Sequence, residues 1–392
     1  MADSKYLFLQ IAFFVLLLSL CPSSATFDKN RKGKTPWSPP IEFKGCFSKV
    51  FAFGDSFTDT GNAQLMGGFK SFMGFQFSKF FGSTDKSLSG YRQCNGRLVI
   101  DFLCESLSLP HLQPYKNSSS DFSSGVNFAI AGATALSSDF FTQFKIGHSL
   151  MWKSIPESFQ TQIDWFHRSL SGKDEAACKA ELEDALIWIG EMGGNDYARL
   201  YGSSIPTQLL TELAVGHVCT LMKAVLDKGA KYIVVQGLPP AGCSPVHLLF
   251  CPTNQRDQYG CSGIANSWII AHNNHLQRKV EEFRLIYRDA MIVYADYFNA
   301  YQTILANYKK YQFEEPFKAC CGSGDGQYNF DLQCLCGATG SSSCKDASKY
   351  ICWDGIHSTE SMHQQISDLF FNQGFCKPSF SDLVKKKRGG SK

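Results

Sequence analysis

The chain has 392 residues, of which 44% are hydrophobic and 19% charged, and its formal net charge is +3 at pH 7. This composition is that of a globular protein, and the length is sufficient for one large domain or two smaller ones. So small a net charge excludes any electrostatic case for a nucleic-acid partner.

The first 25 residues are predicted to be a secretory signal peptide. Lys5 precedes an apolar run from Tyr6 to Cys21, and small residues follow up to Ala25. The alternative is a membrane anchor, but the run is shorter than the roughly 20 apolar residues that a span needs. No later segment is expected to span a membrane either. The sequence therefore predicts a secreted protein without a transmembrane segment.

Polar, basic segments flank the rest of the chain at both ends. Residues 26–45 are expected to form an extended leader, since positions 29–40 read KNRKGKTPWSPP. Residues 377–392 end in KKKRGGSK and are expected to be a basic, disordered tail. A single domain is predicted between them, at 46–376.

Five short apolar segments in this domain are typical of buried strands. They are Val50–Phe53, Val126–Ala131, Ala185–Gly190, Tyr232–Gln236 and Met291–Ala295. Amphipathic helical stretches lie among them, at Pro206–Lys228, Ile264–Tyr287 and Tyr297–Tyr308. This alternation predicts an α/β fold with a mostly parallel sheet that is covered on both faces. In such folds ligands bind beyond the carboxyl ends of the strands.

Small or polar residues follow three of the predicted strands directly. The first strand leads into Gly54-Asp55-Ser56, the second into Gly132, and the third into Gly193-Gly194-Asn195-Asp196. Ser56 has two interpretations, a nucleophile at a strand exit or an ordinary serine that caps the next helix. Asp59 and Asn62 are expected to form local caps or hydrogen bonds without a catalytic role.

A serine nucleophile needs a base, usually a histidine that a carboxylate orients. Two Asp-x-x-His pairs are present, Asp164/His167 and Asp354/His357. The first falls within a helical pattern, where residues three apart are simply neighbours on one face. The second lies in a loop that contains Gly355, and a loop positions an imidazole over a strand exit more readily. His357 is therefore the preferred candidate.

Four segments together resemble the plant GDSL esterase/lipase group of the SGNH hydrolases. They are GDSFTDTGN at 54–62, NFAIAGATAL at 127–136, GGND at 193–196 and DGIH at 354–357. Their order matches that of the family's blocks, and they span most of the mature chain. Phe57 departs from the family's usual leucine, which affects packing beside Ser56. The resemblance implies a flavodoxin-like, three-layer α/β/α sandwich with a five-stranded sheet.

The same resemblance implies a role for each matching residue. Ser56 would be the nucleophile, His357 the base, and Asp354 the carboxylate that orients the imidazole. The oxyanion hole would consist of the Ser56 and Gly132 backbone N–H groups and the Asn195 side-chain amide. No metal and no organic cofactor is implied.

Sixteen cysteines suit an oxidising compartment, and loss of Cys21 with the signal would leave an odd number. Six of them crowd one stretch: Cys320, Cys321, Cys334, Cys336, Cys344 and Cys352. Disulfides are favoured there, and the alternative is a zinc site that uses Cys334 and Cys336. Asn117 heads the only Asn-x-Ser/Thr sequon and is a candidate glycosylation site.

Two further groups have open interpretations. His272 and His275 could bind a metal or lie on a solvated helix face. Six phenylalanines soon after Ser56 could form core or line an acyl pocket: Phe69, Phe72, Phe75, Phe77, Phe80 and Phe81.

The predicted function is a secreted serine carboxylic-ester hydrolase that acts in the apoplast or cell wall. Its substrate would be a small-molecule or polysaccharide ester, such as an acetylated cell-wall polysaccharide, a lipid acyl ester or a specialised metabolite. An acyltransferase with the same acyl-serine chemistry and a non-catalytic carbohydrate- or lipid-binding protein are the alternatives. The sequence does not specify an oligomeric state.

Overall fold

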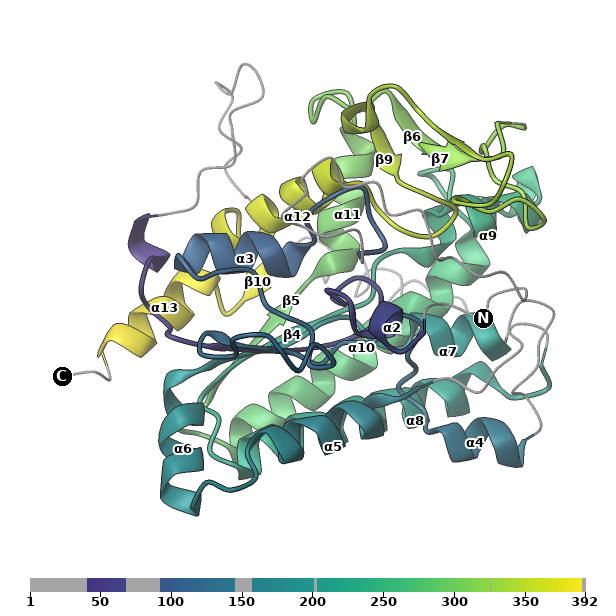
Figure 1. Cartoon of the computed structure of the whole chain (residues 1–392). Helices are drawn as coiled ribbons and strands as arrows, with labels where there is room; N and C mark the ends of the chain where they lie inside the picture. Colours follow the sequence, from purple (N-terminus) through teal and green to yellow (C-terminus); the bar gives the residue numbers. More distant parts are fainter. Residues whose placement is uncertain (1–40, 68–91, 145–156, 201–202, 325, 390–392) are drawn as a thin grey trace, which may run out of the picture. The chain divides into compact units, whose positions relative to one another are not determined.

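The computed structural model describes residues 41–67, 92–144, 157–200, 203–324 and 326–389, which lie within one compact unit, Pro36–Lys392. Its central sheet has the strand order β10-β5-β4-β3-β1-β2 (Figure 1). The strands are β1 (Val50–Phe53), β2 (Gly125–Asn127), β3 (Leu186–Ile189), β4 (Tyr232–Gln236), β5 (Met291–Ala295) and β10 (Cys376–Lys377). The first five are parallel in the order 2-1-3-4-5 of flavodoxin-like sheets, which confirms the predicted fold class.

Two details of the sheet differ from the prediction. β10 adds a sixth strand that runs antiparallel to β5, and its two residues are too few to show a strand pattern in the sequence. β2 ends at Asn127 and not at Ala131. The chain nevertheless stays beside β1, because Phe128 N donates to Ala52 O (2.7 Å) and Ile130 N to Gly54 O (3.1 Å).

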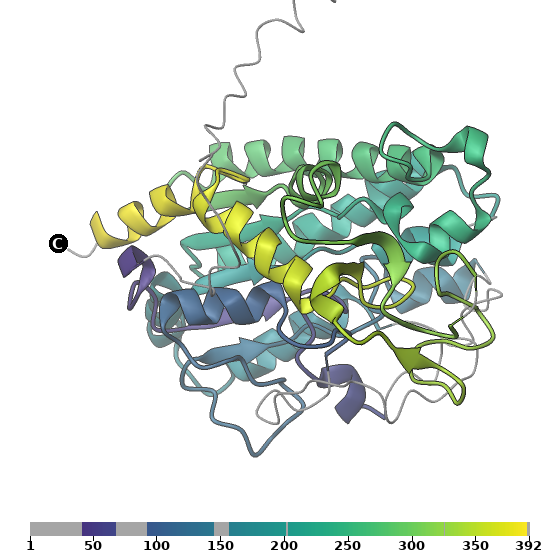
Figure 2. The same cartoon turned by 90° about the horizontal axis from the view of Figure 1, so that it is seen from above.

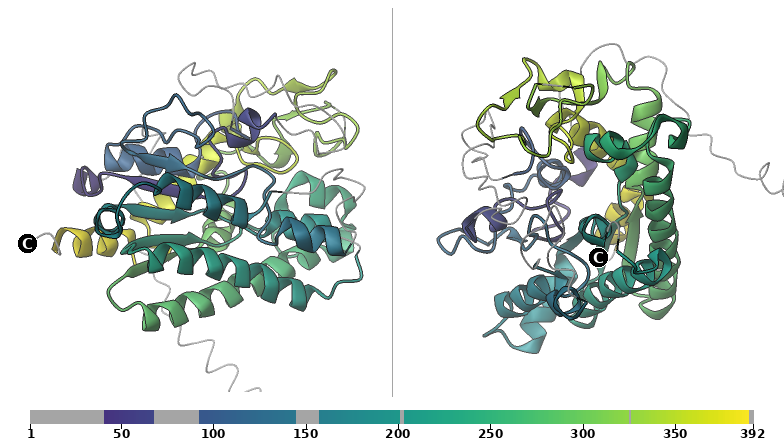
Figure 3. Two further views of the ribbon diagram at one scale, coloured as in Figure 1. Left: turned by 60° about the horizontal axis from the view of Figure 1, so that its bottom comes forward. Right: turned by 90° about the vertical axis from the view of Figure 1, so that its right-hand side faces the viewer.

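Helices cover both faces of the sheet, which gives three layers. One face carries α3 (Val99–Leu107), α11 (Tyr297–Ala306), α12 (Glu360–Asn372) and α13 (Phe380–Gly389). The other carries α5 (Phe159–Ser169), α6 (Glu175–Asp184), α8 (Thr207–Asp227) and α10 (Gly263–Ile286). Figure 2 shows α3 and α12 side by side on the first face, and Figure 3 shows α8 and α10 on the second.

The alternation of side chains along β1 explains why both faces are apolar. Val50 and Ala52 pack into the core beneath α3 and α12, whereas Phe51 and Phe53 pack into the core formed with α5 and α8. All four residues of this strand are buried. Because complete burial of a valine or phenylalanine contributes about 1.5–3 kcal/mol, a continuous apolar run is stable only in such a doubly covered strand.

Helix α8 contradicts the expectation that no later segment is long and apolar enough to cross a membrane. Among the described residues it meets that criterion of length and hydropathy. Its apolar side includes Ala214, Val215, Val218 and Leu221, which are buried in the core with the sheet. A core helix of an α/β sandwich accounts for this composition without a membrane.

The two flanking segments were wrongly delimited. Residues 380–389 form α13 instead of a disordered tail, since Phe380, Leu383 and Val384 follow helical spacing and are buried. The leader ends earlier than residue 45, because Phe43 is fully buried and its ring lies 5.0 Å from that of Phe380. The predicted signal peptide at 1–25 lies outside the described residues.

Disulfides are present in the cysteine-rich stretch, as predicted. The structure contains Cys320–Cys344 and Cys321–Cys336, together with Cys243–Cys261 elsewhere. Since Cys336 is bonded to Cys321, it cannot form the alternative zinc site with Cys334. Cys334 and Cys352 are free thiols, and Cys352 is buried.

Candidate active site

Ser56 lies in a tight turn at the carboxyl end of β1. Asp55 O accepts hydrogen bonds from Thr58 N (3.1 Å) and Asp59 N (2.8 Å), which closes the turn. Gly54 has φ +147°, and a Cβ there would lie 3.1 Å from the Thr58 side chain, so only glycine fits. The short helix that follows, α2 (Asn62–Leu65), is capped by Asp59 and not by Ser56, because Asp59 accepts from the backbone N–H groups of residues 61–63.

Ser56, His357 and Asp354 form a chain of hydrogen bonds across 301 positions of sequence. Ser56 Oγ lies 2.9 Å from His357 Nε2, and His357 Nδ1 lies 2.8 Å from Asp354 Oδ2. A carboxylate can only accept, so the imidazole proton belongs on Nδ1, which leaves Nε2 as an acceptor for the serine hydroxyl. Ser56 and His357 are both buried, at 5% and 8% exposure.

The turn at 354–357 fixes the imidazole in place. Asp354 Oδ1 accepts from Ile356 N and His357 N, each at 2.7 Å. Burial opposes ionisation of Asp354, but the neighbouring His357 and these N–H donors keep the pKa of its carboxyl below the usual value. A Cβ on Gly355 would lie 2.1 Å from the Phe330 ring, so this position also requires glycine.

Gly132 lies beside the Ser56 turn and has a left-handed backbone, with φ +78°. The preceding residue, Ala131, donates its N–H to Asp59 Oδ2 at 2.8 Å, which ties the two segments together. Within the described ranges, neither the Ser56 nor the Gly132 backbone N–H has a protein acceptor. Two backbone donors are therefore available near the serine hydroxyl.

Asn195 lies in the first turn of α7 (Gly194–Leu200) and contacts both of these segments. Its Nδ2 donates to Asp55 Oδ2 at 2.8 Å and to the Ala133 carbonyl at 2.9 Å. Both amide hydrogens thus have protein acceptors here. The next residue, Asp196, accepts from Ala135 N and Leu136 N, and burial raises the pKa of its carboxyl to about 7.

A model of the family described as GDSL-like lipase/acylhydrolase matches residues 50–370. The chain is 39% identical to a GDSL esterase/lipase of Arabidopsis thaliana, over 87% of this chain and 90% of the relative. It is 33% identical to acetylajmalan esterase 2 of Rauvolfia serpentina, over 82% and 88%, and 34% identical to sinapine esterase of Brassica napus, over 86% and 88%. The chain belongs to the GDSL lipase/acylhydrolase family. It is a carboxylic ester hydrolase.

The other Asp-x-x-His pair of this GDSL esterase, Asp164/His167, does not form a comparable site. His167 is exposed on α5, and Asp164 accepts a hydrogen bond from Gln160 Nε2 at 2.9 Å instead.

His272 is fully buried beside Tyr197 (Nδ1 to hydroxyl, 3.2 Å), and burial lowers its pKa to about 3. Across the described residues no cluster of three or more His, Cys, Asp or Glu is placed to hold a metal.

For the predicted glycosylation site and the predicted phenylalanine cluster, the structure adds little. Asn117 is half-buried, and its side-chain oxygen accepts from Ser119 Oγ at 2.9 Å, so its glycosylation stays a prediction. The six phenylalanines between positions 69 and 81 lie outside the described residues.

Gln162 supports the Ser56 turn and was not identified from the sequence. Its Oε1 accepts from Gly54 N at 3.0 Å, and its Nε2 donates to Gly54 O at 2.8 Å. Gly54 is thereby held by both of its backbone groups. No signal in a single sequence distinguishes this glutamine from others on a helix, because its partner lies 108 positions away.

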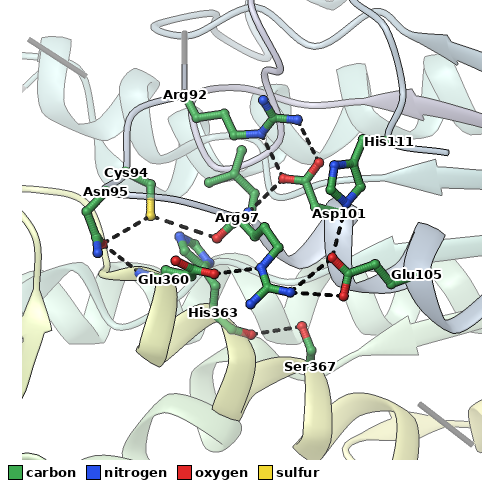
Figure 4. A network of polar contacts seen from close by, with 11 residues as sticks. Arg92, Cys94, Asn95, Arg97, Asp101, Glu105, His111, Glu360, His363 and Ser367 are labelled. Carbon is green, nitrogen blue, oxygen red and sulfur yellow. Dashed lines mark hydrogen bonds and ion pairs between the residues drawn. The ribbon is translucent and has the colours of Figure 1, made fainter. Parts of the chain in front are cut away.

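Phe57, the departure from the family's usual leucine, packs against two histidine rings. Its ring centroid is 5.5 Å from that of His357 and 6.0 Å from that of His363 on α12. Figure 4 shows the polar network around that helix, where Arg97 Nε contacts Glu360 at 2.6 Å and Arg92 pairs with the buried Asp101 at 2.7 Å. α12 begins three residues after His357, so the Arg97–Glu360 pair lies at the start of the helix that follows this histidine.

A cavity of about 460 Å³ opens at the exit of β5, between α10 and α11. Its lining includes Asp257, Tyr259, Asn274, Asp296, Phe298 and Gln302. Ser56, Asp354 and His357 do not line this cavity.

Proposed function

We propose that this GDSL ester hydrolase acts through an acyl-serine intermediate, with Ser56 as nucleophile, His357 as general base and Asp354 as the carboxylate that orients it. The observation that carries the proposal is the hydrogen-bonded chain from Ser56 Oγ through His357 to Asp354. A serine hydroxyl is a weak nucleophile until a base removes its proton, and here His357 Nε2 lies 2.9 Å away.

The first half-reaction forms the acyl-enzyme. Ser56 Oγ attacks the ester carbonyl carbon while its proton moves to His357 Nε2, and the carbonyl oxygen becomes an oxyanion. The C–O bond to the alcohol then breaks, and the alcohol leaves with the proton from His357. Asp354 stabilises the imidazolium that exists between these two steps.

The oxyanion would be bound by the N–H groups of Ser56 and Gly132 and by the Asn195 amide. The two backbone donors are not engaged by acceptors within the described residues, which supports this role. Asn195 would exchange its hydrogen bond to Ala133 O for one to the oxyanion. Such a donor typically lowers the barrier by about 3 kcal/mol.

The second half-reaction releases the acid. Water gives a proton to His357 Nε2 and attacks the acyl carbon, and the bond to Ser56 Oγ then breaks as Ser56 recovers its proton from His357. An alcohol in place of water would make the enzyme an acyltransferase. Product analysis with a competing alcohol present distinguishes the two outcomes.

We further propose that the protein is secreted to the apoplast or cell wall and hydrolyses small acyl or acetyl esters, cell-wall polysaccharide acetyl groups among them. The disulfides suit an oxidising compartment, and one relative is named an acetylajmalan esterase. The test is a panel of p-nitrophenyl esters and acetylated polysaccharides on the purified protein. A non-catalytic binding protein would hydrolyse none of them, and Ser56→Ala would change nothing.

A further inference from the structure

Two carboxyl groups are buried together beneath the Ser56 turn. Asp55 is 3% exposed and Glu191, which follows β3, is 2% exposed, and the two side chains form a hydrogen bond with each other. Two ionised carboxylates are acceptors only, so this contact requires one proton between them. Burial, reinforced by the charge of Asp55, raises the pKa of Glu191 well above its usual value. Burial raises the pKa of Asp55 as well, but Asp55 accepts hydrogen bonds from Phe57 N and Asn195 Nδ2, which favour its ionised form. Glu191 is therefore assigned the proton.

Asp55 also accepts hydrogen bonds from two groups close to Ser56. Its Oδ1 accepts from Phe57 N at 3.1 Å, and its Oδ2 accepts from Asn195 Nδ2 at 2.8 Å. The same carboxylate thus contacts the turn that carries Ser56 and the amide proposed to bind the oxyanion. The titratable groups that face this carboxyl pair are Asp196, His357 and Tyr297.

We propose that Glu191 is a positioning residue of the esterase, whose carboxylic acid O–H holds Asp55 so that Asp55 holds the Asn195 amide beside Ser56. This inference rests on the proposed function, because the Asn195 orientation matters only if that amide binds the oxyanion. As the oxyanion forms, Asn195 releases Ala133 O, while its bond to Asp55 keeps the amide pointing into the site. Nothing in this arrangement requires Glu191 to touch the substrate.

Substitution of Glu191 by an isosteric donor and by an apolar residue separates this role from simple packing. Glu191→Gln keeps an N–H donor toward Asp55, whereas Glu191→Leu removes it. With p-nitrophenyl acetate at pH 7, we expect Glu191→Leu to lower kcat by about 10–100-fold with KM within about twofold, since a misplaced oxyanion donor affects the transition state. Glu191→Gln should restore kcat to within about fivefold of the wild type. Glu212→Gln, on the exposed face of α8, is the matched control and should behave as the wild type.

Each outcome bears on the proposal. A folded Glu191→Gln variant as slow as Glu191→Leu would overturn it, and so would a Glu191→Leu variant with wild-type kcat. If Glu191→Leu does not fold, Glu191→Met gives the same comparison with an unbranched chain of similar length.

Labelling by a fluorophosphonate probe distinguishes failure of this inference from failure of the proposed function. If the wild type is labelled at Ser56 and Glu191→Leu keeps full kcat, only the Glu191 inference is wrong. If Ser56 is not labelled, the proposed function is wrong and the role of Glu191 falls with it.

Discussion

The two residues of the Ser56–His357 contact are held in place by different means. Ser56 follows β1, in the interior of the central sheet. Its turn is fixed by the two hydrogen bonds between Gly54 and Gln162, and by the one that Ala131 N donates to Asp59. His357 lies near the end of a cysteine-rich segment, residues 313–359, seen at the upper right of Figure 1. This segment contains two small sheets, β6–β9 (Glu315–Ala319, Tyr350–Cys352) and β7–β8 (Cys321–Gly322, Ser342–Ser343).

On the His357 side, disulfides stabilise the chain in place of a large hydrophobic core. The disulfides Cys320–Cys344 and Cys321–Cys336 close this segment. Cys320 N donates to Cys352 O at 3.0 Å and Cys321 N to Trp353 O at 2.7 Å, just before Asp354. A segment with few buried apolar residues needs such cross-links. Ser56, the proposed nucleophile, is thus positioned by the sheet, and His357, the proposed base, by the disulfide-bonded segment.

The largest expected effect comes from removing His357, the proposed base. His357→Ala should lower kcat/KM for p-nitrophenyl acetate by about 10⁴-fold or more, because Ser56 then has no proton acceptor. His167→Ala changes the other Asp-x-x-His pair, whose histidine is exposed, and should have no effect. Steady-state kinetics of both variants provide the check. The opposite result would mean that His167 is the base and that the Ser56–His357 contact is incidental.

The next largest effect is expected when one disulfide on the His357 side is removed. Cys320→Ala/Cys344→Ala opens a loop of 24 residues and should cost about 3 kcal/mol of unfolding free energy. At a temperature where the variant stays folded, kcat should also fall several-fold, because the segment that carries His357 loosens. Cys243→Ala/Cys261→Ala opens a similar loop of 18 residues outside this segment. It should lose comparable stability, measured by denaturant unfolding, with a smaller change in kcat; equal losses would argue against a special role of the cysteine-rich segment.

The smallest expected effect is a difference in how pH changes stability on the two sides. The pKa of Asp354 is lowered, so its stabilising contribution is present above its unfolded pKa and disappears as pH falls below about 4. The pKa of Glu191 is raised, so its contribution is present below its unfolded pKa and is lost as pH rises.

Melting temperatures from pH 3 to pH 8 test this contrast. The Tm deficit of Asp354→Asn should shrink toward low pH. Glu191→Gln should gain Tm relative to the wild type toward high pH, where the wild type must bury a second charge. Parallel curves for the two variants would show that these carboxyl groups do not differ as described.

Much of the fold could be predicted because its signals are local. The continuous apolar runs at β1, β3, β4 and β5 have no stable alternative to a covered parallel sheet, and their positions were correct to within a residue or two. The α13 helix was missed because its run of lysines and arginine outweighed the apolar spacing of Phe380, Leu383 and Val384.

The candidate site was predictable only in part, because the residues that support it lie far apart in the sequence. Glycines and a DGIH segment indicate where tight turns place a serine and a histidine, but not which long-range contacts hold them. Gln162 and Glu191 are ordinary residues in the sequence, and only the packing of β1 against α5 and β3 gives them partners. The two hydrogen bonds of Asn195 likewise depend on segments 62 and 140 positions away.

The central claim is that Ser56 is the residue that becomes acylated. Intact-protein and peptide mass spectrometry after treatment with a fluorophosphonate probe tests it most directly. We expect one probe per chain, attached to Ser56 in the wild type, and no labelling of either Ser56→Ala or His357→Ala on the same timescale. Labelling at another residue, or full ester hydrolysis by Ser56→Ala, would contradict the proposed mechanism.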